Sequence, residues 1–151
     1  MNTYKTKKEK MGDLFEDEFF ERMNGKKNPD RWDPTGDGLL DKDITEVKCQ
    51  IRYTPKDGKG YMTINKDFKN QVKKCFDKKV RLFFGEYDKT NFVQVREVID
   101  KDDYIEYTTR DGRNMIGWPI DKMEHIAAWP IGNEISKYSS SKIFKKQFTN
   151  T

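Results

Sequence analysis

Residues 45–53 alternate strictly between polar and apolar side chains, in the order Thr-Glu-Val-Lys-Cys-Gln-Ile-Arg-Tyr. A period of two residues predicts a β-strand with one buried face and one polar face. The buried face is expected to carry the apolar members of the segment, Val47, Cys49, Ile51 and Tyr53. Such a strand needs partners for its backbone and a cover for its apolar face, so this stretch commits the chain to a β-sheet.

A β-hairpin is predicted around this strand. Gly38-Leu-Leu is typical of a short strand, and Asp41-Lys-Asp43 of a tight turn whose side chains bond their own backbone. Asp37 then stands at the head of the first strand, while Glu46 and Lys48 share the polar face of the second. Two carboxylates and one amine are thus able to converge at one point.

These three side chains have the chemistry needed for metal-assisted phosphodiester hydrolysis. Mg²⁺ binds through one or two carboxylates and leaves room for phosphate and water. A neighbouring lysine supplies a compact positive charge that orients an attacking water or offsets charge on a phosphate. The alternative is a solvated strand face, since 37% of the chain is charged and half-exposed antiparallel strands normally carry such residues. On the strand alone, both interpretations stay open.

Length and composition limit the class of protein. A chain of 151 residues, 13% of them aromatic, is expected to form one domain whose core relies on Phe, Tyr and Trp. No segment approaches the roughly 20 apolar residues of a membrane span or resembles a signal peptide, so a cytoplasmic protein without membrane contact is expected. Cys49 and Cys75 are isolated and His125 is the single histidine, which argues against a zinc site and favours reduced thiols. The net charge of +4 permits nucleic-acid binding without establishing it.

A helix is predicted over residues 11–23, because apolar side chains recur on one face at helical spacing. Glu16 lies at the edge of this face, where it is either a cap on the core boundary or a ligand aimed into a cleft. Glu18 is also close to the apolar face, and periodicity alone does not choose between the two glutamates. Residues 1–10 carry four lysines and form a basic arm that either solubilises the chain or touches DNA. Residues 26–36 are predicted to form a loop.

Lysines concentrate after the predicted hairpin. A Gly- and Lys-rich loop is predicted over residues 54–62, where lysines either meet phosphates or simply solvate the loop. A second, basic helix is predicted over residues 63–77. The candidate DNA contacts of this loop and helix are Lys56, Lys59, Lys66, Lys69 and Lys73.

The sequence beyond residue 79 predicts strands at 80–84 and 92–99 around a turn at 88–91, a hairpin at 104–120, a short helix at 121–126 and a C-terminal helix at 133–148.

The order of these elements resembles the PD-(D/E)xK nuclease superfamily, whose motif matches Asp37 and then Glu46-Val47-Lys48 after a hairpin turn. Upstream, Gly12-Asp-Leu-Phe-Glu16 is similar to the G-x-x-x-E helix of archaeal Holliday-junction resolvases. Gln50 matches a polar residue often found two positions after the lysine, where it would orient the groups around it. The resemblance covers about residues 11–99.

The resemblance implies an α/β (α+β) fold of the restriction-endonuclease-like type, with a mixed central β-sheet flanked by helices. It implies a single domain over residues 1–151, with its core at about 11–99 and residues 100–151 as an extension for recognition or dimerisation. One departure is Gly36, which stands before Asp37 where the motif has proline.

The resemblance also implies roles for individual residues. Asp37 and Glu46 would bind Mg²⁺, or Mn²⁺ in its place, helped by the Val47 carbonyl. Lys48 would position or activate water. Glu16 would complete the metal shell or hold a water beside it.

Three functions compete on this basis. The first is a Mg²⁺-dependent DNA endonuclease without a nucleotide cofactor, acting as a homodimer or higher homo-oligomer. It would be either structure-selective for junctions and branched DNA, or sequence-specific of the restriction or homing type. The second is a non-catalytic DNA-binding protein on the same fold, which has no need of clustered acids where phosphates lie. The third is a structural or interaction protein with an exposed charged strand.

Overall fold

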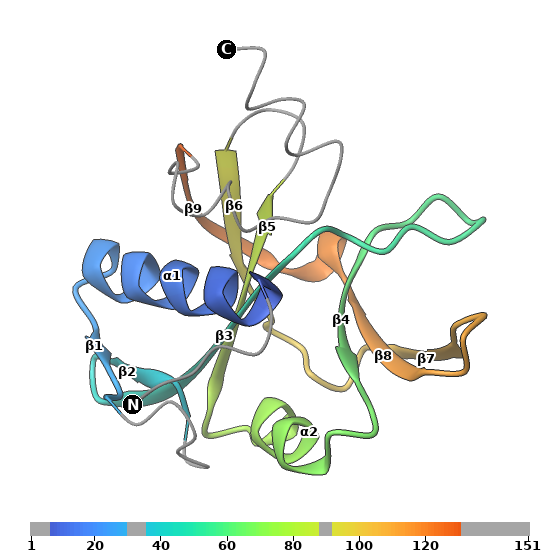
Figure 1. The fold of residues 1–151 in the computed structure, drawn as a ribbon, viewed down its shortest axis with the longest axis horizontal. Coiled ribbons are helices and arrows are strands. Elements are labelled where there is room, and N and C mark those ends of the chain that lie inside the picture. Colours follow the sequence, from blue (N-terminus) through green and yellow to red (C-terminus); the bar gives the residue numbers. More distant parts are fainter. Residues whose placement is uncertain (1–6, 30–35, 88–91, 131–151) are drawn as a thin grey trace.

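The computed structural model describes residues 7–29, 36–87 and 92–130, with side chains from residue 12 onward. This part of the chain is a mixed α/β structure with a six-stranded sheet, a three-stranded sheet and two α-helices (Figure 1). The elements in chain order are α1 (Lys7–Arg22), β1 (Lys26–Lys27), β2 (Gly38–Leu40), β3 (Asp43–Gln50), β4 (Tyr61–Asn65), α2 (Lys69–Phe76), β5 (Arg81–Tyr87), β6 (Phe92–Glu97), β7 (Ile105–Thr108), β8 (Asn114–Pro119), the 3₁₀ turn η1 (Ile120–Lys122) and β9 (Glu124–Pro130).

The larger sheet has the strand order β1-β2-β3-β5-β6-β9. Its central strands β3 and β5 are parallel, whereas the other neighbours are antiparallel. In the parallel pair Glu46 lies opposite Leu82, and Val47 lies opposite Phe83. Because successive side chains alternate between the faces of a sheet, Glu46 and Leu82 face one side and Val47 and Phe83 the other. The smaller sheet has the order β4-β8-β7 and is antiparallel.

Helix α1 covers one face of the larger sheet. Its rings Phe15, Phe19 and Phe20 are fully buried and form a core with residues of β3, β5, β6 and β9. The rings of Phe19 and Phe83 lie with their centroids 5.1 Å apart. The predicted apolar face of the first helix and the predicted aromatic core are therefore confirmed.

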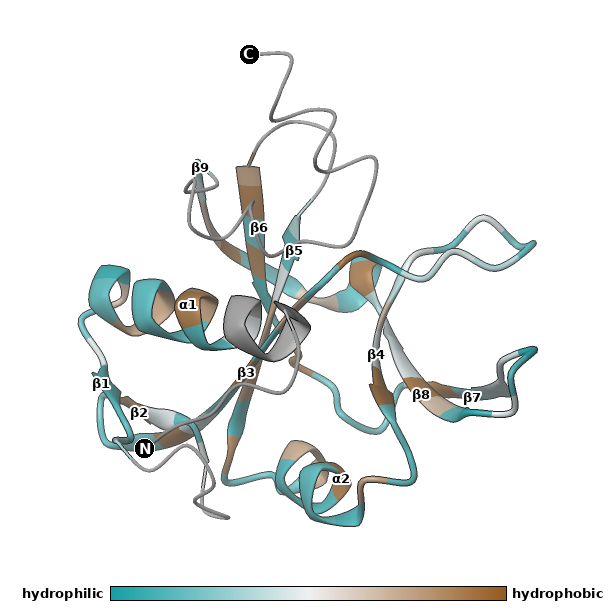
Figure 2. Cartoon of the chain, viewed as in Figure 1, coloured by the Kyte–Doolittle hydropathy of each residue, from teal (hydrophilic) through white to brown (hydrophobic). Residues whose placement is uncertain are grey.

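Helix α2 and the smaller sheet cover the opposite face. A second core joins them to β5, and its buried members are Met62, Ile64, Cys75, Leu82, Phe84, Val98, Ile116, Trp118 and Ile120. The six-stranded sheet is therefore the middle of three layers (Figure 1). In Figure 2 strands β3 and β6 carry hydrophobic stretches, whereas α2 is mostly hydrophilic.

The prediction for residues 54–77 is partly wrong, because β4 at Tyr61–Asn65 replaces the end of the predicted loop and the start of the predicted helix. Met62 and Ile64 alternate into the second core and are 0% and 4% exposed. Asn65 then ends the strand, since its Oδ1 accepts a hydrogen bond from the Asp67 backbone N–H at 2.9 Å. This side-chain turn delays the start of α2 until Lys69.

Two further boundaries differ from the predictions. The strand predicted over 45–53 ends at Gln50, and Ile51 is 45% exposed because the chain leaves the sheet there. Tyr53 instead forms an isolated bridge with Tyr61. The helix predicted over 121–126 is wrong, because these residues are the end of the 3₁₀ turn η1 and the start of strand β9, which pairs with β6.

The remaining predicted strands are confirmed as the β2–β3 hairpin, β5, β6 and the β7–β8 hairpin. A short strand, β1, interrupts the loop predicted over 26–36. Residues 7–10 of the predicted arm belong to α1, while residues 1–6, the turn at 88–91 and the helix predicted at 133–148 lie outside the described residues. No helix in the described ranges is both long enough and apolar enough to cross a membrane.

Candidate active site

Asp37 is fixed at the point where the β2–β3 hairpin ends. Its backbone N–H donates to Thr45 O at 2.9 Å. This hydrogen bond is the last one between the backbones of the two hairpin strands, on the edge of β3 that faces β2. The next N–H of β3 on that side is that of Val47, and it donates to Asp37 Oδ2 at 2.7 Å. The Asp37 carboxylate thus accepts the hydrogen bond that the backbone of a longer β2 would otherwise accept from Val47. Gly36 forms the bend before Asp37 with φ of 147°, a backbone conformation that residues with a side chain rarely adopt.

Glu46 and Lys48 extend from β3 toward α2, on the face opposite to α1. The Glu46 side chain is 1% exposed, and Lys48 Nζ lies 3.3 Å from its Oε2. Lys74 of α2 approaches the other oxygen, with Nζ 3.6 Å from Oε1. Glu46 Oε1 is nevertheless one of the buried side-chain atoms of the described residues that have no hydrogen-bond partner.

The Asp37 and Glu46 carboxyl groups are neighbours. Burial, the negative charge of Glu46 and a hydrogen bond between the two side chains raise the pKa of Asp37 to about 6, against the opposing effects of Lys48 and the Val47 N–H. Burial alone would lower the pKa of Lys48, but the Glu46 and Asp37 carboxylates hold it above its ordinary value. The site therefore combines two crowded carboxylates with a lysine that stays charged at neutral pH.

Glu16 joins this group from α1. Burial and the charge of Asp37 raise its pKa to about 9. Glu18, the other candidate on the helix, instead pairs with Arg22 at 3.2 Å. Of the two glutamates, Glu16 is thus the one that the helix places beside Asp37.

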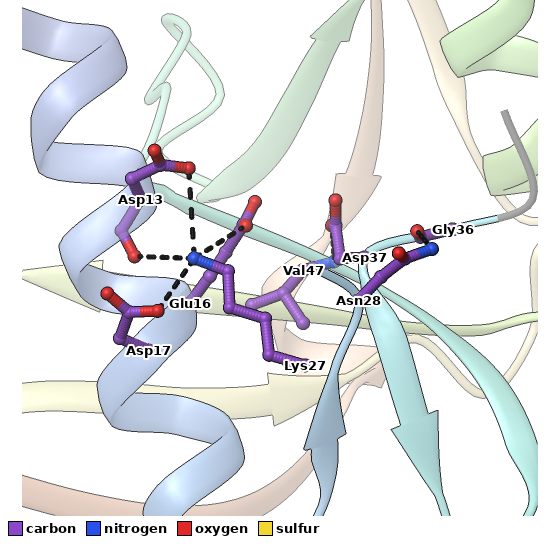
Figure 3. Close-up of polar contacts among 8 residues, drawn as sticks. All are labelled: Asp13, Glu16, Asp17, Lys27, Asn28, Gly36, Asp37 and Val47. Atoms are coloured by element: carbon purple, nitrogen blue, oxygen red, sulfur yellow. Dashed lines mark hydrogen bonds and ion pairs between the residues drawn. The ribbon is translucent and has the colours of Figure 1, made fainter. Parts of the chain in front are cut away.

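Lys27 is a neighbour of the site that sequence reasoning missed (Figure 3). Its Nζ bonds Asp17 Oδ1 at 2.7 Å and lies 3.9 Å from both Asp13 Oδ1 and Glu16 Oε2. In Figure 3 the Lys27 ammonium stands among these carboxylates of α1. The sequence signal for it was weak, because position 27 fell in a predicted loop.

Gln50 lies on the same face of β3 but binds elsewhere. Its Oε1 accepts from the Thr63 backbone N–H at 2.7 Å and its Nε2 donates to Thr63 O at 2.8 Å. The side-chain amide therefore completes the open edge of β4 as a neighbouring strand would. The structure places Gln50 as a link between the two sheets.

The five predicted DNA-contact lysines are all exposed. Lys56 and Lys59 lie in the loop between Tyr53 and β4, and Lys69 and Lys73 lie on α2. Lys66 precedes α2 and pairs with Glu106 of β7 at 2.6 Å.

The residues present suit a divalent cation bound by a carboxylate pair. In residues 7–29, 36–87 and 92–130 no group of three or more His, Cys, Asp or Glu side chains could hold a metal ion. Mg²⁺ requires only one or two carboxylates, with phosphate and water completing its shell. A cation at this point would relieve the repulsion between Asp37 and Glu46, and would give a partner to Glu46 Oε1, which has no hydrogen bond in the described part of the chain.

No protein-family model, no curated protein and no solved structure significantly matches this chain. The resemblance to PD-(D/E)xK nucleases therefore stays a prediction.

Proposed function

We propose that this chain is a Mg²⁺-dependent DNA endonuclease of the restriction-endonuclease-like type. The observation that carries the proposal is the pair of neighbouring carboxyls, half-buried Asp37 and buried Glu46, with Lys48 Nζ 3.3 Å from Glu46 Oε2. Two crowded acids in a stable fold are costly unless a cation joins them. A lysine beside such acids can stabilise the negative charge that builds up on a phosphate during hydrolysis.

In this proposal Asp37 and Glu46 hold the cation, with the Val47 carbonyl as a further oxygen ligand. The Val47 N–H points to Asp37, and because the N–H and C=O of a strand residue point to the same side, its carbonyl points there too. The bound cation would supply Lewis-acid stabilisation of the phosphate and a more acidic water.

The chain's own residues supply the remaining functions. Lys48 orients the attacking water and offsets charge on the phosphate, held in place by its contact with Glu46. Glu16 has a pKa raised to about 9 in the metal-free protein, so its protonated carboxyl is able to donate a hydrogen bond to a water beside Asp37. Water attacks phosphorus, the bond from phosphorus to the leaving deoxyribose oxygen breaks, and that oxygen takes up the proton that the water loses, so the products are a phosphate monoester and a free hydroxyl.

The exposed lysines are proposed to bind the DNA backbone, with Lys69 and Lys73 on the helix that also carries Lys74 into the site. Lys56 and Lys59 would extend the contact from the neighbouring loop. A homodimer would cut both strands, and sedimentation equilibrium would show a mass near twice that of one chain.

The proposal is tested by incubating supercoiled plasmid, linear duplex, flap and four-way-junction DNA with the protein and Mg²⁺ or Mn²⁺. Wild-type protein should cut at least one of these DNAs, while Asp37→Asn and Lys48→Met should each lose at least about a hundredfold in rate. Asp41→Asn makes the same chemical change in the exposed β2–β3 turn and should leave cleavage intact. Salt-dependent DNA binding without cleavage of any form would support the non-catalytic alternative instead.

A further inference from the structure

Helix α2 directs one lysine into the site and leaves others in solvent. The Lys74 side chain is 21% exposed and its Nζ lies 3.6 Å from Glu46 Oε1. Lys69 and Lys73 of the same helix are exposed. Lys48 approaches Oε2 at 3.3 Å, so the two lysines stand against different oxygens of one buried carboxylate.

The contact between Lys74 and Glu46 is an ion pair without a hydrogen bond. Glu46 Oε1 is buried and has no hydrogen-bond partner in the described part of the chain. Buried carboxylate oxygens normally have such a partner, and losing it costs stability. The charge of Lys74, 3.6 Å away, therefore compensates the charge of this oxygen without a hydrogen bond, which leaves a hydrogen-bonding or coordinating position open.

We propose that Lys74 is an internal counter-ion of Glu46 that a divalent cation displaces, so that Lys74 lowers the affinity of the site for the cation. This inference rests on the proposed function, because it places the cation at Asp37 and Glu46. Lysine suits the role, since its charge is compact and its four-carbon stem lets Nζ leave Oε1 while the helix stays in place. Lys74 is a positioning residue, since it acts through Glu46.

The test is a titration of the full chain with Mn²⁺, followed by electron paramagnetic resonance of the free ion in the absence of DNA. Lys74→Met removes a positive charge close to the position proposed for the cation, and it should bind Mn²⁺ about tenfold more tightly than wild type. Lys74→Arg retains the charge and can add a hydrogen bond to Glu46, so it should bind Mn²⁺ no more tightly than wild type. Lys79→Met is the control at an exposed lysine shortly after α2, and because solvent screens an exposed charge it should leave Mn²⁺ affinity unchanged.

Thermal unfolding separates this role from a purely structural one. In a chelator Lys74→Met should melt below wild type, since Glu46 loses its counter-ion, and saturating Mn²⁺ should raise its Tm by more than it raises that of wild type. Lys74→Gln serves the same titration if the methionine variant does not fold.

Unchanged or weaker Mn²⁺ binding by the neutral variants, with normal binding by wild type, would overturn the counter-ion role alone. Absence of Mn²⁺ binding by wild type would overturn the metal site as well. The two failures are therefore distinguishable.

Discussion

Among the carboxyl groups of the described residues, Glu16 and Asp37 have the most strongly raised pKa values. The pKa of Glu16 rises from 4.5 to about 9 and that of Asp37 from 3.8 to about 6, in both cases mainly through burial. At a pH between the ordinary and the raised pKa of each group, the folded protein binds more protons than the unfolded chain. The free energy of unfolding therefore falls as pH rises through this window.

The first prediction concerns this pH dependence. In the presence of a metal chelator, the Tm should fall as the pH rises from about 5 to about 9. Glu16→Gln should make this decline shallower, because it removes the carboxyl whose pKa differs most between the folded and the unfolded protein. Glu21→Gln, at an exposed position of the same helix, is the control and should follow wild type. Parallel pH profiles for wild type and Glu16→Gln would contradict the burial of this carboxyl beside Asp37.

The second prediction concerns Gln50, for which sequence resemblance implies an orienting role at the catalytic site. Because its amide makes two hydrogen bonds to the Thr63 backbone, Gln50→Ala should lower the free energy of unfolding by about 1–3 kcal/mol. Urea denaturation measures this, with Gln94→Ala, which breaks a more exposed contact to His125, as the control. Full stability combined with lost cleavage would instead favour the orienting role.

At the residue scale the sequence predicts part of the site. The hairpin and the period of β3 place Asp37, Glu46 and Lys48 near one another, because both are local features. The burial of Glu46 is not local, since it depends on α2 covering the strand. The predicted helix carried Lys74 among several lysines, and helical spacing alone did not show which of them faces β3.

At the element scale, α1 and β5 show how closely the layers approach. Phe15 lies directly over Gly85, where an added Cβ would stand 2.6 Å from the ring carbon Cε1. A glycine in the middle of a strand normally weakens it, so its presence here reflects the close approach of the helix. This contact sets the depth at which α1 lies, and so the position of Glu16.

The third prediction pairs two glycine substitutions. Gly85→Ala should destabilise the protein by about 1–3 kcal/mol, because the added methyl overlaps the Phe15 ring. Gly12→Ala lies in α1, where nothing stands within 4 Å of an added Cβ, and should stabilise it by up to about 1 kcal/mol through helix propensity. Urea denaturation of both variants measures the difference, and equal effects of the same sign would contradict the packing of α1 on β5.

The elements that sequence failed to predict are those defined by tertiary partners. Strand β4 is five residues long, and its alternation was outweighed by the helical spacing of Phe68, Val72 and Cys75 beyond it. Strand β9 follows a 3₁₀ turn and exists because β6 offers an edge. Longer segments such as α1 and β5 were predictable, because their periodic patterns extend over several turns or alternations.

At the scale of the whole molecule, the six-stranded sheet holds the carboxylate pair while the helices on its two faces add Glu16 and Lys74. Residues beyond 99 belong to this arrangement, since β8 pairs with β4 and β9 with β6. The site thus depends on all three layers, and segments far apart in sequence complete it.

The fourth prediction concerns DNA affinity. Neutralising Lys69 and Lys73 together, as Lys69→Gln with Lys73→Gln, should weaken binding uniformly across DNA sequences and reduce the slope of log K against log salt by about 2. Fluorescence anisotropy at several salt concentrations measures this. Lys122→Gln is the control, because that lysine already pairs with Asp103 at 2.5 Å. Equal slopes for the double variant and wild type would exclude α2 from the DNA contact.

The central claim is that Asp37 and Glu46 share one divalent cation. An anomalous-difference map from crystals of the wild-type protein soaked in Mn²⁺ tests it most directly. We predict one peak between these two carboxylates, which disappears in Asp37→Asn crystals soaked in the same way. A Mn²⁺ peak elsewhere, with none between Asp37 and Glu46, would contradict the claim.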